Sequence, residues 1–445
     1  MGSTVDGLIS GMDTTTMIQS MMKIESQPKT MLQAKITAAQ SVVGSYQSVN
    51  SKLATLKTAA DDLSQLSTWR AVKPRVSTTS VTATATGGLN TATGSVTFDV
   101  VSLAKAQATT ARVASSGDIT AAASIQVTVG GGDPVSIDVS ADRSAAGVAA
   151  AINAANVGVK ASVVATSQGD SVLQLGGTKT GAANSFTVAG MDDVALRTTT
   201  AASDAQIQVG GADADGGYGL TSSTNTFTGL MAGVTMTVSK VESGITLDSN
   251  ADVDGIAAKF QALVDAANAT LSEISRQTAY DSAKKTGSPL TGDFMVRQMS
   301  QSILSAVSQG LTYSDDSVRD ASGNPTTVTF GSMARFGIQL DRGGQLTFDR
   351  DTFVAAYNAD PTAIRKAGTA LGDQFEALAG KQSDSVAAQI TSRNNHIDSM
   401  NSEIDNWDVR LSARRVALTK QYADLETALG NLKNQSTWLS GQLSG

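Results

Sequence analysis

The sequence contains no cysteine among its 445 residues. This excludes disulfides, thiolate catalysis, and iron–sulfur or zinc sites built on cysteine. Only one histidine is present, His396, so any mechanism that needs two histidines is excluded by counting. A chain without cysteine suits an exported protein, although cytosolic proteins can also lack this residue.

Basic charge, aromatic side chains and long apolar runs are also scarce. The chain has 33 Lys and Arg against 40 Asp and Glu, a net charge of −7, which offers no broad basic surface for nucleic acid. No run of about 18 apolar residues occurs, so we expect no membrane insertion. The start, Met1 to Asp13, has no basic segment followed by an apolar one. We therefore expect no cleaved Sec-type signal peptide.

No segment carries a convincing catalytic or metal-binding pattern. The stretch from Asp213 is similar to a fragment of a calcium loop, but its twelfth position is Thr224 rather than a bidentate Glu. The glycines from Gly130 lack the Gly-Lys-Ser/Thr ending of a phosphate loop. Both segments therefore read as turns. Adjacent carboxylates such as Asp315 and Asp316 are typical of solvated surface. We predict no enzyme, and no catalytic, cofactor-binding or metal-ligating residue.

The N-terminal part of the chain has a helical pattern. A short helix is expected to be capped around Asp13 or Thr14, and Pro28 is expected to be the first residue of a second helix. In the second helix apolar residues recur every seven positions, which is typical of a coiled coil. The two columns are Leu32, Ala39, Tyr46, Leu53 and Ala60, and Ile36 and Val43, the latter shifting to Val49, Leu56 and Leu63. The early methionines, Met12, Met17, Met21, Met22 and Met31, predict either a helix simply buried in this protein or one that adapts to several surfaces.

The C-terminal part carries a longer pattern. Eight apolar residues fall on one seven-residue register: Ile390, Ile397, Ile404, Leu411, Leu418, Leu425, Leu432 and Leu439. With no proline from Thr362 onward, this predicts one long helix. The companion column is mixed, because Arg414 and Arg415 interrupt it. A helix buried in its own domain would also be amphipathic, but both chain ends carry a narrow stripe. We predict that the ends pair and leave apolar surface for another subunit.

The middle of the chain alternates with a period of two, from Arg70 to about Asn250. Residues 125–129 and 135–139 predict a strand, a turn and a strand. Residues 144–156 predict a helix, followed by strands at 157–164 and 171–175, and further strands are expected at 78–86, 94–103, 206–209 and 227–241. Helices return at 256–274 and 294–307, and a hairpin is expected at 338–348. The fold class is multidomain α+β, with long N- and C-terminal helices forming coiled-coil legs and a helical stem, and β-rich head domains inserted between them.

Several blocks, in order, resemble the bacterial flagellar filament capping protein family, also called the hook-associated protein 2 family. They are Gly7–Asp13, Glu25–Pro28, Gly94–Gln107, Asn225–Val238, Pro289–Asp293, Phe336–Leu346 and Trp438–Leu443. Residues 148–164 are also similar to the small repeat inserted in flagellins and hook proteins. With this resemblance we expect a terminal coiled-coil leg at 1–45 and 405–445, and a helical stem with small β elements at 46–75 and 250–404. One β-rich head domain is expected at 76–118 and 204–249. A second, with a flagellin-type β/α insert, is expected at 119–203.

The resemblance implies a structural cap at the distal tip of the flagellar filament that promotes folding and insertion of exported flagellin. It further implies a homo-oligomer, a pentamer or hexamer, with no cofactor and no nucleic acid. The subunit would be secreted through the flagellar type III route without a signal peptide and would be extracellular at the tip. Its other partners would be flagellin, hook-associated junction proteins and an export chaperone on the C-terminal helix.

The candidate partner-binding residues lie in the terminal helices. They are Met17, Ile18, Met21, Met22, Leu32, Leu411, Leu418, Leu425, Leu432, Trp438 and Leu439. Two alternatives remain open at this point: a hook–filament junction protein or other filament component such as flagellin, and a surface adhesin acting through the head domains. Against flagellin, the N-terminus lacks that family's Ser-Gly-x-Arg-Ile-Asn block.

Overall fold

The computed structural model describes residues 13–87, 90–166, 169–211 and 215–443. The turn expected at Asp213 and most of the opening block, residues 7–12, lie outside the described residues. The chain divides into two compact units, Met1–Ser64 with Ala257–Gly445, and Gln65–Ile256. The first unit is therefore assembled from both ends of the sequence and the second from its middle.

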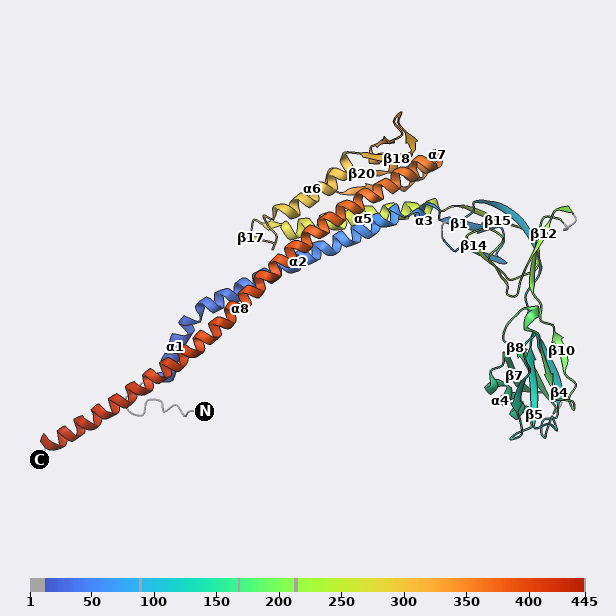
Figure 1. Cartoon of the computed structure of the whole chain (residues 1–445), viewed down its shortest axis with the longest axis horizontal. Coiled ribbons are helices and arrows are strands. Elements are labelled where there is room, and N and C mark those ends of the chain that lie inside the picture. Colours follow the sequence, from blue (N-terminus) through green and yellow to red (C-terminus); the bar gives the residue numbers. More distant parts are fainter. Residues whose placement is uncertain (1–12, 88–89, 167–168, 212–214, 444–445) are drawn as a thin grey trace. The chain divides into compact units, whose positions relative to one another are not determined.

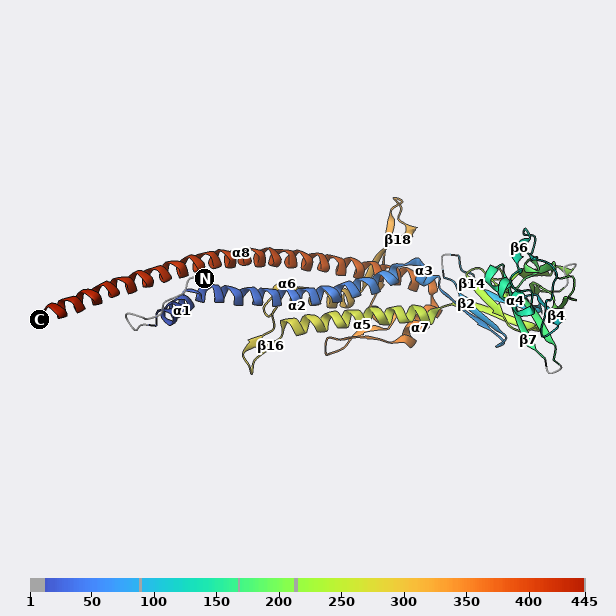
Figure 2. The same cartoon turned by 90° about the horizontal axis from the view of Figure 1, so that it is seen from below.

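The first unit is mainly helical (Figures 1 and 2). Asp13 begins α1 by accepting a hydrogen bond from the Thr16 backbone N–H at 2.8 Å, as the sequence predicts. Pro28 is the second residue of α2, one position later than expected, where its missing N–H costs no hydrogen bond. The predicted long C-terminal helix is confirmed as α8, with 83 residues. The helices are α1 Thr14–Glu25, α2 Gln27–Ser64, α5 Val253–Thr278, α6 Phe294–Ser308, α7 Arg350–Ala359 and α8 Pro361–Leu443.

The core of the helical unit is built from the seven-residue columns of α2. Both columns pack along α8 and are buried except for Leu32 and Ala39, which are partly buried, and the shift after Val43 brings Val49, Leu56 and Leu63 into the core. Tyr46 and Leu53 also contact α5 and α6 through a shared cluster. Side chains of the two columns therefore pack against α5 and α6 as well as against α8.

Three small antiparallel hairpins complete this unit. The hairpin predicted at 338–348 is confirmed, and Gly344 in its turn has φ of 81°, a conformation that favours glycine. Phe260 of α5 lies 4.7 Å from Phe353 of α7 and 5.2 Å from Phe336, between ring centroids, and anchors the hairpin region. The hairpins are β16 Tyr280–Asp281 with β17 Thr286–Gly287, β18 Leu311–Arg319 with β19 Pro325–Gly331, and β20 Ile338–Leu340 with β21 Leu346–Phe348.

The second unit holds two β-rich bodies, each with its own core. The first contains a five-stranded antiparallel sheet in the order β1-β15-β3-β11-β12 and a three-stranded sheet β13-β14-β2. Phe98, Ile207, Met236 and Leu247 are buried between them. The elements are α3 Leu66–Trp69, β1 Val72–Val76, β2 Val81–Ala85, β3 Gly94–Ser102, β11 Ala205–Val209, β12 Tyr218–Ser222, β13 Thr226–Phe227, β14 Val234–Val238 and β15 Glu242–Ala251.

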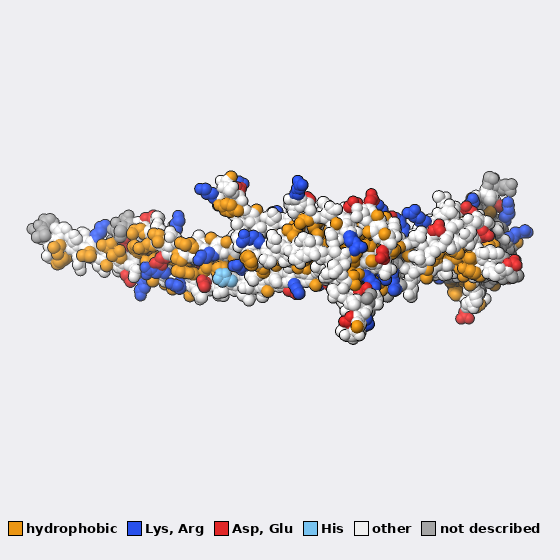
Figure 3. Space-filling view, turned by 90° about the horizontal axis from the view of Figure 1, so that it is seen from above, with side chains coloured by type: hydrophobic (Ala, Val, Ile, Leu, Met, Phe, Trp, Pro, Cys, Tyr) orange, Lys and Arg blue, Asp and Glu red, His pale blue; other side chains and the backbone are white. Residues whose placement is uncertain are grey.

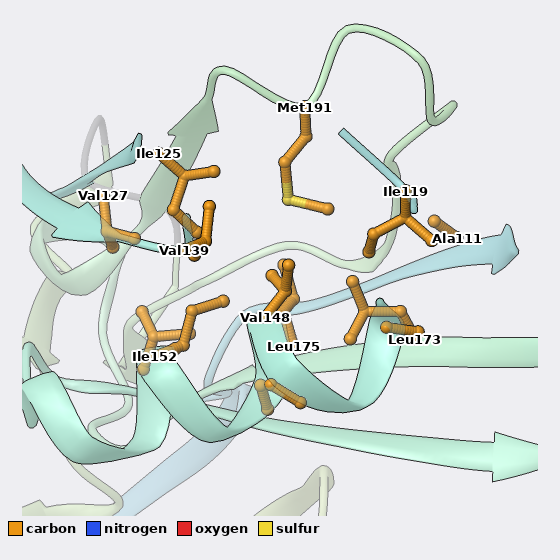
Figure 4. Packing of buried hydrophobic residues seen from close by; sticks show 14 of the residues in the cluster. Ala111, Ile119, Ile125, Val127, Val139, Val148, Ile152, Leu173, Leu175 and Met191 are labelled. Atoms are coloured by element: carbon orange, nitrogen blue, oxygen red, sulfur yellow. The ribbon is translucent and has the colours of Figure 1, made fainter. Parts of the chain in front are cut away.

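The second β body packs the sheets β10-β4-β8-β7 and β6-β5-β9 around helix α4 (Figure 4). The predicted strand–turn–strand and the helix after it are confirmed as β5, β6 and α4, with Ser144 as the N-cap of α4. Val148 and Ile152 of α4 are fully buried against the sheets. The elements are β4 Ala108–Val113, β5 Ser124–Val129, β6 Val135–Asp138, α4 Ala145–Ala155, β7 Val159–Ala165, β8 Ser171–Gly177, β9 Phe186–Ala189 and β10 Arg197–Thr200.

This second body is nested inside the first one. The chain enters and leaves it at a two-residue bridge, where Lys105 and Ser203 exchange backbone hydrogen bonds of 2.9 and 3.1 Å. Strand β4 pairs with β8 and its Ala111 and Val113 belong to the nested core. The structure therefore places residues 108–113 with the second body, whereas the sequence-based boundary was drawn between residues 118 and 119. The strand pattern around residue 110 carries no signal for which sheet it joins.

Candidate partner-binding leg

The leg is the paired stretch made by residues 14–45 of α1 and α2 and residues 390–443 of α8. The helices α1 and α2 run antiparallel to α8, as the side-chain contacts between them show. Lys29 pairs with Asp408, Glu25 with Arg414 at 2.9 Å, and the Tyr422 hydroxyl lies 3.8 Å from the sulfur of Met21. Residue numbers fall from α2 to α1 as they rise along α8.

The inner part of the leg has a small apolar core. Ile36 and Val43 of α2 are buried against Ile397 and Met400 of α8, and Leu32, Ala39, Ile390 and Ile404 pack around them. The prediction that the two chain ends pair with each other is confirmed here. The pairing uses the apolar columns that the sequence pattern identifies.

The inner end of the leg is fixed to the bundle by a polar contact. The hydroxyl of Tyr46 donates a hydrogen bond to the Asp293 carboxylate, which also caps α6 by accepting from the Val296 N–H at 3.1 Å. Burial raises the pKa of Tyr46 to about 12, and the hydrogen bond and negative charge of Asp293 act in the same direction. Tyr46 therefore stays protonated and keeps donating across the whole physiological range.

The eleven predicted residues fall into two groups. Met22 and Leu418 are buried, and Ile18, Leu32 and Leu411 are partly buried. The other six point to solvent, although Leu425, Leu432 and Leu439 continue the seven-residue spacing of Leu411 and Leu418. These outward residues are Met17, Met21, Leu425, Leu432, Trp438 and Leu439.

Four of these exposed residues lie on the last part of α8, and Figure 3 shows apolar side chains along the leg. Met21 is level with Tyr422, so Thr14, the first residue of α1, is level with roughly position 429. Roughly 20 Å of α8 extends past that level, at 1.5 Å per residue. Trp438 is 63% exposed and Leu432 62%. A regular apolar row thus continues beyond the length of α1.

A groove of about 520 Å³ lies where α1 meets α2, beside α8. Its lining mixes apolar side chains with charges of both signs, which is common in protein–protein contact surfaces. The lining residues are Gln19, Met22, Lys23, Ser26, Asp408, Leu411, Ser412 and Arg415.

The sequence pattern missed two features of the leg. Arg414 looks like an interruption of the apolar column, but the structure shows it paired with Glu25. Ile24, Met31, Val409 and Val416 are strongly exposed, with fractions between 61% and 71%. Ile24 and Met31 are seven residues apart, and so are Val409 and Val416. The same seven-residue spacing, searched for on the outer face of the helices, could have found them.

The described residues contain no group of three or more side chains suited to hold a metal ion. Within the same residues, no helix is both long and apolar enough to cross a membrane. The arrangement of the leg offers apolar and paired polar surface, which is the chemistry of contact between proteins.

Three comparisons with known proteins agree. The model described as flagellar hook-associated protein 2 C-terminus matches residues 202–434, the corresponding N-terminus model matches residues 10–107, and the flagellin hook IN motif matches residues 124–178. The last match covers the segment that resembles the insert of flagellins and hook proteins.

The chain is also similar to named proteins from two bacteria. The flagellar hook-associated protein 2 of Escherichia coli K12 is 24% identical over 98% of this chain and 97% of its own length. The lateral flagellar hook-associated protein 2 of Vibrio parahaemolyticus is 29% identical over 61% of this chain and 58% of its own. A crystal structure of the D1-D2-D3 domains of the flagellar cap protein from Escherichia coli has the same fold. It gives a TM-score of 0.58 at 24% identity, covering 79% of this chain and 99% of that one.

Proposed function

The chain belongs to the flagellar hook-associated protein 2 family, and from this premise we propose that it is the structural cap at the distal tip of a bacterial flagellar filament. In this role it promotes folding and insertion of exported flagellin and needs no catalytic residue. The observation that carries the proposal is the exposed apolar row on α8, formed by Leu425, Leu432 and Leu439. A row of this regularity fits a partner helix.

The row supports contact with flagellin or with a neighbouring subunit. A cap in this family is an oligomer, here proposed to be a pentamer or hexamer, and it differs in symmetry from the filament below it. Its legs therefore cannot all make the same contact at once. A leg that can release and rebind meets this requirement.

The leg is held in a way that suits release. Beyond the small core at Ile36 and Val43, the pairing uses a few buried apolar residues such as Met22 and Leu418 together with exposed ion pairs, which contribute about 0–1 kcal/mol each. The distal leg is thus weakly paired, while its inner end is anchored by Tyr46. One subunit could then change its flagellin contact without disturbing its own bundle.

The remaining proposals concern export and location. We place the protein outside the cell at the filament tip, delivered by the flagellar type III route without a cleaved signal peptide. The exposed end of α8 around Trp438 is the proposed contact for an export chaperone, and hook-associated junction proteins are further proposed partners.

Complementation of a strain that lacks its cap tests the proposal. We expect the wild-type chain to restore filaments seen by electron microscopy and to stop flagellin leaking into the medium. Verified export with continued leakage into medium from a strain carrying the matching flagellin would contradict the cap function.

A matched pair of variants tests the row. Leu425→Gln and Leu432→Gln together interrupt the row with residues that favour helix, and they leave the end around Trp438, the proposed chaperone contact, unchanged. We expect export and folding to persist and filament growth to be lost. The control, Val135→Gln and Val164→Gln, places the same polar residue at two exposed valines of the second unit. A strain that carries this control should grow normal filaments.

A further inference from the structure

The exposed methionines of this protein are concentrated in the leg. The chain has 13 methionines and no cysteine, and the structure describes 11 of the methionines. Only three of those described are exposed, Met17 at 42%, Met21 at 43% and Met31 at 61%. The other eight are buried or partly buried: Met22, Met191, Met231, Met236, Met295, Met299, Met333 and Met400.

Two of the exposed methionines, Met17 and Met21, line a groove that a small reagent can enter. This groove of about 550 Å³ is mainly apolar, and Asp13, Thr16 and Ser20 also line it. The sulfur of Met21 also accepts a hydrogen bond from the Tyr422 hydroxyl at 3.8 Å. This exposed methionine is therefore part of the contact between α1 and α8.

We propose that Met17 and Met21 of α1 form an oxidation site at which peroxide releases α1 from α8. A lone pair of the thioether sulfur attacks one peroxide oxygen and the O–O bond breaks. The sulfur loses two electrons and becomes a sulfoxide, and the other oxygen leaves as water after taking a proton. Because the chain has no thiol, no more reactive sulfur of its own competes for the peroxide.

The physical consequence follows from what the sulfoxide does to the helix. Oxidation turns a flexible apolar side chain into a polar one, which disfavours the packing of Met21 against Tyr422 of α8. Helix α1 has only 12 residues, and a helix of this length is marginal without a partner. Release of α1 therefore leads to its unfolding, whereas α2 stays packed in the bundle through Tyr46 and Leu53.

The test uses the full chain and hydrogen peroxide at rising dose. We expect peptides with Met17, Met21 and Met31 to gain the mass of one oxygen atom before those with Met191, Met236 or Met333. Amide hydrogen exchange of residues 14–26 should then lose its protection, while residues 46–63 keep theirs. Treatment with methionine sulfoxide reductases of both stereospecificities should restore the protection.

Leucine variants separate the chemistry from general damage. The change Met17→Leu, Met21→Leu, Met31→Leu keeps the approximate volume and removes the reactive sulfur. Its α1 should stay protected at doses that expose α1 in the wild type. The control, Met231→Leu and Met295→Leu, carries the same change at two partly buried positions and should lose protection as the wild type does.

Two outcomes would overturn the proposal. One is oxidation that reaches the buried methionines as early as the three in the leg. The other is full oxidation of the three with no change in the exchange of α1. The proposal depends on the cap function only for its biological consequence. Neither readout involves filaments, so failure of the wild-type chain to restore filaments would count against the cap function alone.

Discussion

A single buried carboxylate joins α2 to α5. Glu273 of α5 accepts hydrogen bonds from Ser48 of α2 at 2.5 Å and from Arg276 and Gln277 of its own helix at 2.5 and 2.8 Å. Burial alone would raise its pKa. The hydrogen bonds and the charge of Arg276 outweigh burial and hold the pKa of Glu273 at about 2, below its ordinary value of 4.5.

This shift predicts how acid destabilises the helical unit. Because the folded-state pKa is depressed, the ionised Glu273 stabilises the fold fully above pH 4.5, and this contribution is lost as pH falls toward 2. Glu273→Gln should lower the free energy of unfolding at neutral pH by at most about 3 kcal/mol. Its stability should also depend less on pH between 4.5 and 2. Urea unfolding followed by circular dichroism across this range measures both effects.

The control for this change is Glu403→Gln, at an exposed position of α8. Exposed substitutions of this kind usually alter stability by less than about 0.5 kcal/mol. Equal pH profiles for wild type and Glu273→Gln would mean that the carboxylate network does not stabilise the fold.

At the scale of elements, the close packing of α2 on α8 depends on one glycine. A Cβ atom added at Gly372 of α8 would lie 2.6 Å from the backbone nitrogen of Ser64 and 2.7 Å from the carbonyl oxygen of Ala60. These are backbone atoms of α2, which cannot rotate away as a side chain can. The end of α2 therefore approaches α8 as closely as it does because position 372 has no side chain.

The consequence is a reversal of the usual effect of Gly→Ala in a helix. Replacing glycine by alanine in a helix interior normally stabilises the fold by roughly 1 kcal/mol. The variant Gly380→Ala should be stabilised by this amount, because nothing lies within 4 Å of its added Cβ atom. Gly372→Ala should instead lose about 1–3 kcal/mol, because the added methyl group overpacks the contact. Urea midpoints of the two variants measure the difference. A stabilised Gly372→Ala would show that the helices can separate at no cost.

The seven-residue columns predicted most of the helical unit, and particular residues show where this failed. Ile36, Val43, Ile397 and Leu418 are all buried as their spacing indicates. The spacing alone does not say which residues of the two helices are level, because that offset depends on contacts such as Glu25 with Arg414. The columns also do not show where one helix extends past the end of its partner. Leu418 and Leu432 therefore looked equivalent, although Leu418 is buried and Leu432 is exposed. In the β unit, the alternation of apolar and polar residues predicted strands but not which sheet each strand joins.

At the scale of the whole molecule, the chain is organised by nested insertions. The chain enters the β unit, the second unit of residues Gln65–Ile256, through β1 and leaves it through β15. These two strands pair antiparallel, with Val72 opposite Ala251. Just outside this pair, the Asp252 N–H donates to the Ala71 carbonyl at 2.9 Å. The ends of the β unit therefore meet, as do the ends of the body nested inside it at Lys105 and Ser203. Segments whose ends meet are those that can be inserted into a chain while keeping their own fold.

This organisation predicts that residues 65–256 fold alone. The segment contains two complete cores and both strands that close its ends, so no strand of its sheets has to come from elsewhere. Expressed by itself, it should unfold cooperatively, with a midpoint within roughly 2–4 °C of the corresponding transition in the full chain. A difference of that size equals about 1 kcal/mol for a domain of this length.

Ile152→Ala identifies the transition, because Ile152 is fully buried in the nested core and its truncation should cost about 2–5 kcal/mol. The same lowering of the midpoint should appear in the fragment and in one transition of the full chain, measured by calorimetry. The matched change Val164→Ala, at an exposed position of β7, should leave both midpoints nearly unchanged. If the fragment lacked a cooperative transition, the two cores would need the helical unit to fold. The chain would then be one cooperative body rather than a helical frame that carries an independent β insert.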